Sequence, residues 1–256
     1  MKNWCLILFL FFALLACNTS QSQKNNKKPT ICLIGGTPST TAILEMLPDS
    51  LQEKYHFISF NRPGYGGSEN AKLTDSLLYQ LAQNAGLKKG DFGVIGVSGG
   101  GPLSILLASH FKLKHCGVIS GMVSKEAFFN HADGAVTKQL MENVLAGYNE
   151  FEEATLQFPN VNEIIKHAGA PNKEIGIMAC YNDLNFILSQ SLYKSIQNKK
   201  ITIDWWHGEK DVNVPLESVK EFIKDYPNTK LHIIPEASHS IDSNIYIGKL
   251  IKEWEK

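Results

Sequence analysis

Short apolar runs alternate with stretches of helical pattern along the chain from residue 30 onward. The runs are continuous and do not alternate with polar residues, which is typical of strands covered on both faces, as in a parallel sheet with crossover helices. Most of them end in a glycine-rich or polar turn. The pattern predicts strands at residues 31–34, 56–60, 92–97, 117–120, 201–206 and 230–234.

Helical patterns occupy the stretches between these strands. They cover residues 40–47, 74–85, 102–110, 216–225 and 243–254. Strict alternation of strand and helix predicts an α/β fold with a doubly wound, mostly parallel sheet. Active sites in such sheets lie beyond the carboxyl ends of the strands, so the turns at those ends are where chemistry is expected.

One long segment, residues 123–197, breaks this alternation. Its pattern is mostly helical, with aromatic residues scattered through it, and it lies between the fourth and fifth predicted strands. We therefore expect a core made of residues 30–122 and 198–256, with residues 123–197 inserted as a helical cap.

The N-terminus has the pattern of a targeting segment. Lys2 precedes an apolar run over residues 6–15, which is shorter than the about 20 residues that a membrane-spanning helix needs. The run has the right length for a signal peptide, expected at residues 1–16. Residues 17–29 are polar and of low complexity, so we expect a flexible tether there.

Cys17 follows Leu14-Leu15-Ala16, and this segment resembles a bacterial lipobox. The resemblance implies that Cys17 becomes the first residue and carries lipid. The folded part would then be held at a membrane of the bacterial cell envelope, outside the cytoplasm. The alternative is an ordinary signal peptide with an incidental Cys17.

Charge and cysteine content narrow the function classes. Lys and Arg together number 25, as do Asp and Glu, and Arg62 is the only arginine. A neutral chain with one arginine does not favour nucleic-acid binding, and a small-molecule substrate is expected instead. The five cysteines form neither a Cys-x-x-Cys pair nor a zinc-type spacing and favour no disulfide pairing. Cys32 and Cys116 lie in apolar stretches typical of strands, where cysteine acts as a small buried apolar residue.

The strongest chemical motif runs from Gly96 to Gly100. The sequence Gly-Val-Ser-Gly-Gly matches G-x-S-x-G, directly after a predicted strand and before a predicted helix. A serine on such a turn is held in strained backbone geometry, and small neighbours prevent clashes. The N-terminus of the helix favours negative charge that develops beside it. The motif therefore predicts Ser98 as a nucleophile; the alternative is a glycine-rich turn without one.

The run GVSGGGP at residues 96–102 resembles the nucleophile elbow of the α/β-hydrolase superfamily. The segment HGEKDVNVP at 207–215 is similar to that family's turn after the penultimate strand, which implies Asp211 as the triad acid. Ala-Ser-His at 237–239 follows the last strand, where the family has its catalytic histidine, which implies His239 as general base. The order Ser, Asp, His is also the family's order.

Two further segments extend the resemblance, one of them with a departure. Residues 62–68, RPGYGGS, resemble the family's R-G-x-G-x-S loop, whose role is largely structural. Residues 35–38 read Gly-Gly-Thr-Pro where the family often has His-Gly. By position, the backbone N–H groups of Thr37 and Gly99 form the oxyanion hole. The strand pair that usually precedes this loop is missing, so we expect an α/β-hydrolase fold shortened at its N-terminus.

Simpler interpretations of the site residues stay open at this stage. Asp211 suits a surface turn and His239 an exposed loop. A zinc site made of His207, Asp211 and His239 is disfavoured, because the three lie on turns without a carboxylate-rich neighbour. Ser120 also follows a strand but has no glycine elbow.

The resemblance implies a serine hydrolase that cleaves an ester, thioester or amide bond through an acyl-enzyme on Ser98. No cofactor or metal is expected. One alternative is an aminopeptidase similar to proline iminopeptidases, disfavoured because the insertion offers no identifiable acidic pair for a free amine. The other is a non-catalytic envelope binding or scaffolding protein, whose signature would be an incomplete triad.

Overall fold

A computed structural model describes residues 28–189, 192–193, 201–241 and 243–256. The predicted signal peptide and the predicted lipidation at Cys17 lie outside this part of the chain, as does nearly all of the predicted tether. No helix in the described ranges is long and apolar enough to cross a bilayer.

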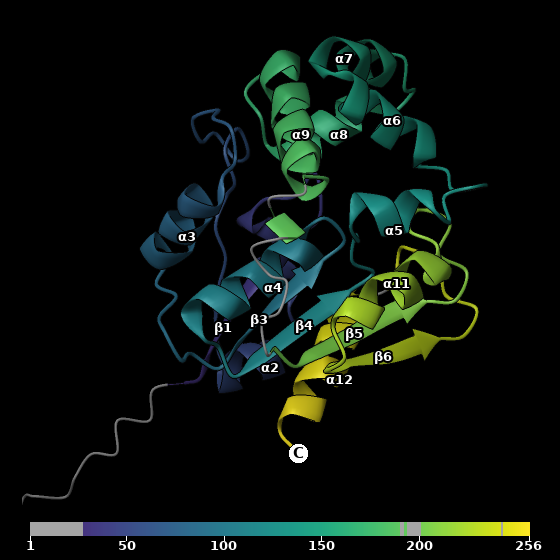
Figure 1. The fold of residues 1–256 in the computed structure, drawn as a ribbon. Coiled ribbons are helices and arrows are strands. Elements are labelled where there is room, and N and C mark those ends of the chain that lie inside the picture. Colours follow the sequence, from purple (N-terminus) through teal and green to yellow (C-terminus); the bar gives the residue numbers. More distant parts are fainter. Residues whose placement is uncertain (1–27, 190–191, 194–200, 242) are drawn as a thin grey trace, which may run out of the picture.

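Six parallel strands form one sheet in the order β2-β1-β3-β4-β5-β6 (Figure 1). The chain winds outward from β1 to β2 on one side and from β3 to β6 on the other, so the predicted doubly wound α/β sheet is confirmed. The strands are β1 (Thr30–Ile34), β2 (His56–Ile58), β3 (Gly93–Val97), β4 (His115–Ile119), β5 (Ile203–Gly208) and β6 (Thr229–Ile234).

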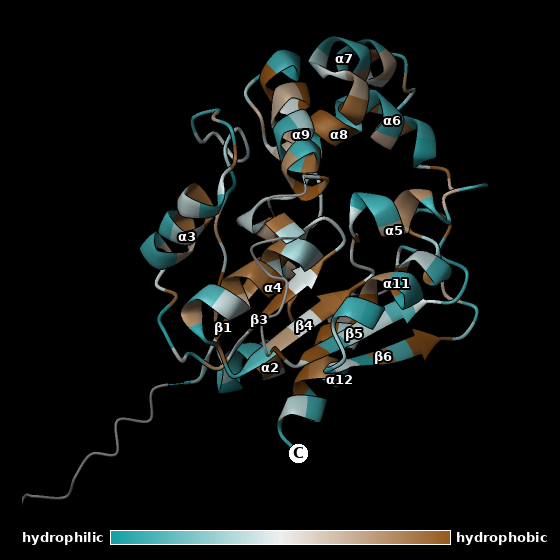
Figure 2. Ribbon diagram, in the orientation of Figure 1, coloured by the Kyte–Doolittle hydropathy of each residue, from teal (hydrophilic) through white to brown (hydrophobic). Residues whose placement is uncertain are grey.

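Each face of the sheet has its own apolar core, because successive strand residues point to opposite sides. On β1, Cys32 and Ile34 face one core while Ile31 and Leu33 face the other. All four are buried, which explains why the apolar runs in the sequence are continuous. The first core is covered by α3 (Asp75–Asn84), α4 (Gly100–Phe111) and α11 (Leu216–Phe222), which continues into η2 (Ile223–Asp225). Figure 2 shows hydrophobic residues concentrated in α4 and β4 near the middle of the view.

The second core is covered mainly by α12 (Ser243–Trp254). Ile247, Leu250, Ile251 and Trp254 of this helix all face the sheet, at the spacing of one helical face. Two short elements complete this side, η1 (Thr41–Met46) and α2 (Asp49–Lys54).

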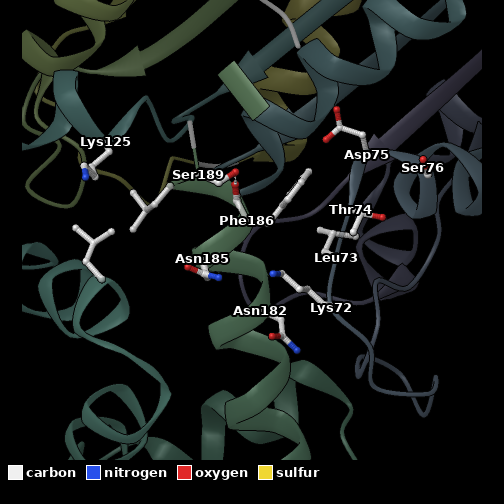
Figure 3. A pocket seen from close by; sticks show the side chains of 12 residues that line it. Lys72, Leu73, Thr74, Asp75, Ser76, Lys125, Asn182, Asn185, Phe186 and Ser189 are labelled. Carbon is white, nitrogen blue, oxygen red and sulfur yellow. Dashed lines mark hydrogen bonds between the residues drawn. The ribbon is translucent and has the colours of Figure 1, made fainter. Parts of the chain in front are cut away.

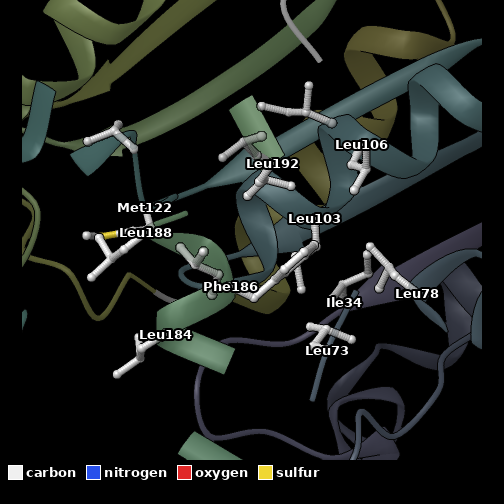
Figure 4. Packing of buried hydrophobic residues seen from close by; sticks show 14 of the residues in the cluster. Ile34, Leu73, Leu78, Leu103, Leu106, Met122, Leu184, Phe186, Leu188 and Leu192 are labelled. Carbon is white, nitrogen blue, oxygen red and sulfur yellow. The ribbon is translucent and has the colours of Figure 1, made fainter. Parts of the chain in front are cut away.

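The described residues between β4 and β5 form α5 (Lys125–Phe129), α6 (Lys138–Ala146), α7 (Tyr148–Leu156), α8 (Val161–Ala168) and α9 (Lys173–Ile187). Helices α6 to α9 pack on one another and lie at the top of Figure 1, away from the sheet. Figure 4 shows that the end of α9 and the residues after it reach the core, where Phe186 and Leu188 pack in one cluster with Leu103 and Leu106 of α4.

Three local predictions differ from the structure. Residues 40–47 form a 3₁₀ helix, η1, because Pro48 forces Leu47 into an extended conformation and leaves too short a stretch for an α-helical ladder. Helix α2 was not predicted, since none of its six residues is buried and no apolar periodicity marks it. The fourth strand spans His115–Ile119, not residues 117–120, because Ser120 leaves the strand with φ +46°.

Candidate active site

Ser98 lies on the turn between β3 and α4 with φ +50°, a left-handed conformation that costs a non-glycine residue about 1–3 kcal/mol. Its backbone is fixed on both sides. The Ser98 N–H donates to the carbonyl of Ile119 at 2.9 Å, and its carbonyl accepts from the amides of Gly101 at 2.9 Å and Met122 at 3.1 Å. The neighbouring strand β4 therefore holds the serine on its strained turn.

Two glycines of the motif are required by close approach of the backbone. A Cβ added to Gly96 would lie 2.2 Å from the carbonyl oxygen of Gly100, and one added to Gly100 would lie 2.4 Å from that of Ile34. Real Cβ atoms do not approach backbone this closely, so α4 can follow β3 this tightly only with glycine at both positions. The G-x-S-x-G spacing thus has a steric reason in this chain.

His239 follows β6 and lies between Ser98 and Asp211. Its Nε2 lies 3.0 Å from Ser98 Oγ, and its Nδ1 lies 2.9 Å from Asp211 Oδ2. The imidazole is about one-fifth exposed, whereas the Asp211 side chain is fully buried. The structure therefore brings together three residues that are 113 and 28 positions apart in the sequence.

Asp211 follows β5 and is held by its own turn. Its Oδ1 accepts from the amides of Asn213 and Val214, both at 2.9 Å. Its Oδ2 lies 3.2 Å from Nε2 of His207, in addition to the contact with His239. Donors to both oxygens leave the carboxylate a single orientation, in which it accepts from Nδ1 of His239.

His207 is a contributor whose role at this site the sequence did not indicate. It is fully buried on β5, and its Nε2 also lies 2.9 Å from the carbonyl oxygen of Val214. Trp205 Nε1 lies 3.4 Å from His207 Nδ1, which assigns the proton of the neutral ring to Nε2. Burial lowers the pKa of His207, with the charge of Asp211 acting in the opposite direction. The single N–H of a neutral His207 therefore donates to the Val214 carbonyl, and the ring lies beside Asp211 Oδ2.

The loop after β1 lies against the nucleophile. A Cβ added to Gly36 would lie 3.0 Å from Cβ of Ser98, and one added to Gly99 would lie 2.6 Å from Thr37 Oγ1. Thr37 and Gly99 are therefore neighbours beside Ser98. Among the described residues, neither amide has a hydrogen-bond acceptor. Both N–H groups are free to donate to a bound molecule.

A cavity of about 570 Å³ adjoins this arrangement. Its lining includes Val97, which precedes Ser98, and Gly36, where an added Cβ would lie 3.0 Å from Cβ of Ser98; Lys166 and His167 of α8 line it as well. The remaining lining comes from the residues after β1 and from η1, namely Pro38, Ser39, Thr40, Ala42, Ile43, Glu45 and Met46.

A second cavity, of about 620 Å³, lies between the start of α3 and the end of α9 (Figure 3). Lys72 and Asn185 line it. None of Ser98, Asp211 and His239 lines either cavity, but the first contains Gly36 and Val97, which lie beside Ser98.

The described residues contain no group of three or more His, Cys, Asp or Glu side chains placed to hold a metal ion. Nε2 of His207, a residue considered above for zinc, donates to the Val214 carbonyl and lies 3.2 Å from Asp211 Oδ2. Cys32, Cys116 and Cys180 are free and buried. Burial raises the pKa of each to about 12, so they are thiols at neutral pH.

No model of a protein family matches the chain, and no curated protein matches it either. Solved structures do. MGS-M2, an alpha/beta hydrolase enzyme from a Medee basin deep-sea metagenome library, is 14% identical with a TM-score of 0.62, and the match covers 90% of each chain. A lipase-esterase related protein from Clostridium acetobutylicum is 18% identical with a TM-score of 0.62, covering 90% of this chain and 96% of that one.

MenH from S. aureus is 17% identical with a TM-score of 0.62, covering 89% of this chain and 95% of that one. The chain has the α/β-hydrolase fold, as its sequence motifs predicted.

Proposed function

We propose that the protein is a serine hydrolase that cleaves an ester bond, or a related thioester or amide bond, through an acyl-enzyme on Ser98. One observation carries the proposal: a continuous chain of contacts links Ser98 Oγ to His239 Nε2 at 3.0 Å and His239 Nδ1 to Asp211 Oδ2 at 2.9 Å. A nucleophile, a base and a group that orients the base are the three parts that such catalysis needs.

The contacts of Asp211 determine how His239 acts. A carboxylate only accepts hydrogen bonds, so Nδ1 of His239 carries the proton and Nε2 presents a lone pair to Ser98. His239 takes the hydroxyl proton as Ser98 Oγ attacks the substrate carbonyl, and then gives it to the leaving group. In the second step His239 activates water, which releases the acyl group and restores the free serine.

The attack places negative charge on the carbonyl oxygen of the substrate. The free amides of Thr37 and Gly99 are the proposed donors to this oxyanion. Donors of this kind, fixed before the reaction, are each worth about 3 kcal/mol of transition-state stabilisation. The N-terminus of α4 faces the same side and adds favourable potential.

A small or medium substrate fits the cavity of about 570 Å³ between η1 and α8. An aminopeptidase would need a free carboxylate for the substrate amine. The buried carboxylate of Asp183 on α9 lies next to Thr37, but both its oxygens are already bonded, chiefly to Arg62. Among the residues that line the cavity only Glu45 carries a carboxylate, so no acidic pair is present to hold an amine, and an ester substrate without a charged amine is the better match. A non-catalytic role leaves the assembled triad without an explanation.

The proposal includes a place in the cell, which rests on the sequence alone. The lipobox-like segment that ends at Cys17 supports cleavage before Cys17 and attachment of lipid to it. The hydrolase would then act at a membrane surface of the bacterial envelope, outside the cytoplasm.

The test is turnover of p-nitrophenyl esters of increasing acyl length by the purified protein and by Ser98→Ala. The parent should release p-nitrophenol, with an initial burst if deacylation is slow. Mass spectrometry of the digested protein should show the acyl adduct on the peptide that contains Ser98. The variant should show neither. A folded parent that turns over no ester would contradict the proposal and leave the binding-protein interpretation in its place.

A further inference from the structure

Arg62 and Asp183 form a fully buried ion pair beside the loop that follows β1. Each is 2% exposed, and Nε of Arg62 lies 2.9 Å and 2.8 Å from the two carboxylate oxygens of Asp183. Burial alone would lower the pKa of Arg62, but the charge of Asp183 outweighs it, and the pKa stands above its usual range. A buried ion pair of this kind often adds little to the stability of a fold. The role of Arg62 and Asp183 is therefore sought in the other groups that each of them contacts.

The remaining donors of Arg62 hold the backbone next to the nucleophile. Nη1 donates to the carbonyl of Gly35 at 3.0 Å and Nη2 to that of Gly36 at 2.6 Å. The Gly36 carbonyl and the Thr37 N–H belong to one planar trans peptide unit, so they point in opposite directions. Arg62 holds the Gly36 carbonyl toward its guanidinium group, so the Thr37 N–H points away from Arg62.

Asp183 holds the same residue by its side chain. Its Oδ2 accepts from Thr37 Oγ1 at 2.8 Å and from the hydroxyl of Tyr65 at 3.1 Å. A Cβ added to Gly99 would have Thr37 Oγ1 as its nearest neighbour, at 2.6 Å. The side chain of Thr37 is thus held next to Gly99, whose amide is the second proposed oxyanion donor.

The two charged residues come from different parts of the fold. Arg62 belongs to the loop after β2, where the Ser68 hydroxyl donates to its carbonyl at 2.8 Å. Asp183 belongs to α9, one of the helices inserted between β4 and β5. The inserted helices therefore contact the loop after β1 through a charged group.

We propose that Arg62 and Asp183 are positioning residues that aim the Thr37 amide at the oxyanion, so that an inserted helix completes the catalytic site. The inference rests on the proposed function. It assigns a role to the only arginine of the chain and to one aspartate on the otherwise apolar buried face of α9. Neither residue touches the substrate in this scheme; both act through the Gly36–Thr37 peptide.

The experiment measures kcat and KM for p-nitrophenyl acetate, and the inhibition constant of a small trifluoromethyl ketone, in the full-length protein and in Asp183→Asn and Arg62→Lys. Since losing one oxyanion donor lowers kcat about 10²–10³-fold, a misdirected donor should lower it about 10–100-fold. KM should stay within about threefold, and the inhibition constant should rise by the factor by which kcat/KM falls, because the ketone adduct carries the oxyanion.

A second pair of variants keeps the test decisive if the buried pair cannot be changed without unfolding. Thr37→Val removes the hydroxyl that Asp183 holds and leaves the backbone amide in place, while Thr37→Ser retains the hydroxyl. The valine variant should lose kcat several-fold and the serine variant should recover it. Asp133→Asn, which alters an exposed pair with Lys138, is the control and should match the parent.

The outcomes separate this inference from the proposed function. An active parent whose folded Asp183→Asn and Thr37→Val variants keep their kcat and their affinity for the ketone would overturn the positioning role alone. A folded parent without esterase activity would overturn the proposed function and this inference with it.

Discussion

Asp211→Asn is the smallest change that tests how the triad works, because it alters one atom of a fully buried side chain. In the parent, Oδ1 accepts from two backbone amides, and Oδ2 accepts from Nδ1 of His239 and lies 3.2 Å from Nε2 of His207. All three hydrogen-bond partners are donors, and an asparagine offers only one acceptor oxygen. Whichever way the amide is turned, its NH₂ group faces at least one donor.

The consequence for His239 can be worked out from these contacts. The two backbone amides cannot move, so the asparagine oxygen stays with them and its NH₂ group faces His239. Nδ1 must then accept, Nε2 carries the proton, and the imidazole can no longer take a proton from Ser98. The wrong tautomer in a comparable triad lowers kcat about 10⁴-fold, which corresponds to about 5.5 kcal/mol. A buried NH₂ group without an acceptor should also lower the free energy of unfolding by about 1–3 kcal/mol.

The assay is steady-state hydrolysis of a p-nitrophenyl ester together with urea unfolding of each variant. Asp204→Asn is the matched control, because Asp204 is also buried on β5 but accepts from Trp254 Nε1 at 3.0 Å, a bond that asparagine retains. It should keep kcat within about twofold of the parent. An Asp211→Asn variant within tenfold of the parent would refute the tautomer argument.

Three further predictions follow from the same contacts. Gly96→Ala places a Cβ 2.2 Å from the Gly100 carbonyl oxygen and should lower the free energy of unfolding by about 1–3 kcal/mol or more, whereas Gly248→Ala, with no atom nearer than 3.9 Å, should raise it slightly; urea unfolding compares the two. Because burial lowers the folded-state pKa of His207, its contribution to stability is present above about pH 6.5 and is lost as pH falls, so His207→Gln should flatten the acid side of the stability profile measured by thermal unfolding, and an unchanged profile would contradict this. Cys17→Ala should move the protein from the membrane fraction to the soluble fraction and abolish incorporation of labelled palmitate; retention in the membrane would contradict the lipid anchor.

The elbow and the sheet could be predicted from sequence because their signals are local. Gly96 and Gly100 are required by contacts within a few residues of Ser98, and the strands are continuous apolar runs because both faces are covered. The resemblance located Asp211 and His239 at strand ends. The contacts of His239 with Ser98 and with Asp211 then follow from the parallel order of the sheet, which brings those ends to one edge.

The supporting contacts could not be predicted in the same way. The contact between His207 and Asp211 depends on the turn after β5. Nothing in the spacing distinguishes His207 from a metal ligand or from an ordinary buried strand residue. Arg62 and Asp183 are 121 positions apart, so no local pattern connects them. A signal was present, however: Asp183 lies three residues after Cys180 and four before Ile187, on the buried face of α9, where an unpartnered charge would be costly.

The measurement that tests the central claim most directly is labelling of the purified protein with a fluorophosphonate probe, which reacts only with an activated serine. The parent should be labelled stoichiometrically, Ser98→Ala and His239→Ala should not be labelled, and mass spectrometry should place the adduct on Ser98. Ser120→Ala is the matched control, since Ser120 is buried at the end of the neighbouring strand, also at positive φ, and should label like the parent. A folded parent that stays unlabelled, or an adduct that persists in Ser98→Ala, would contradict the account.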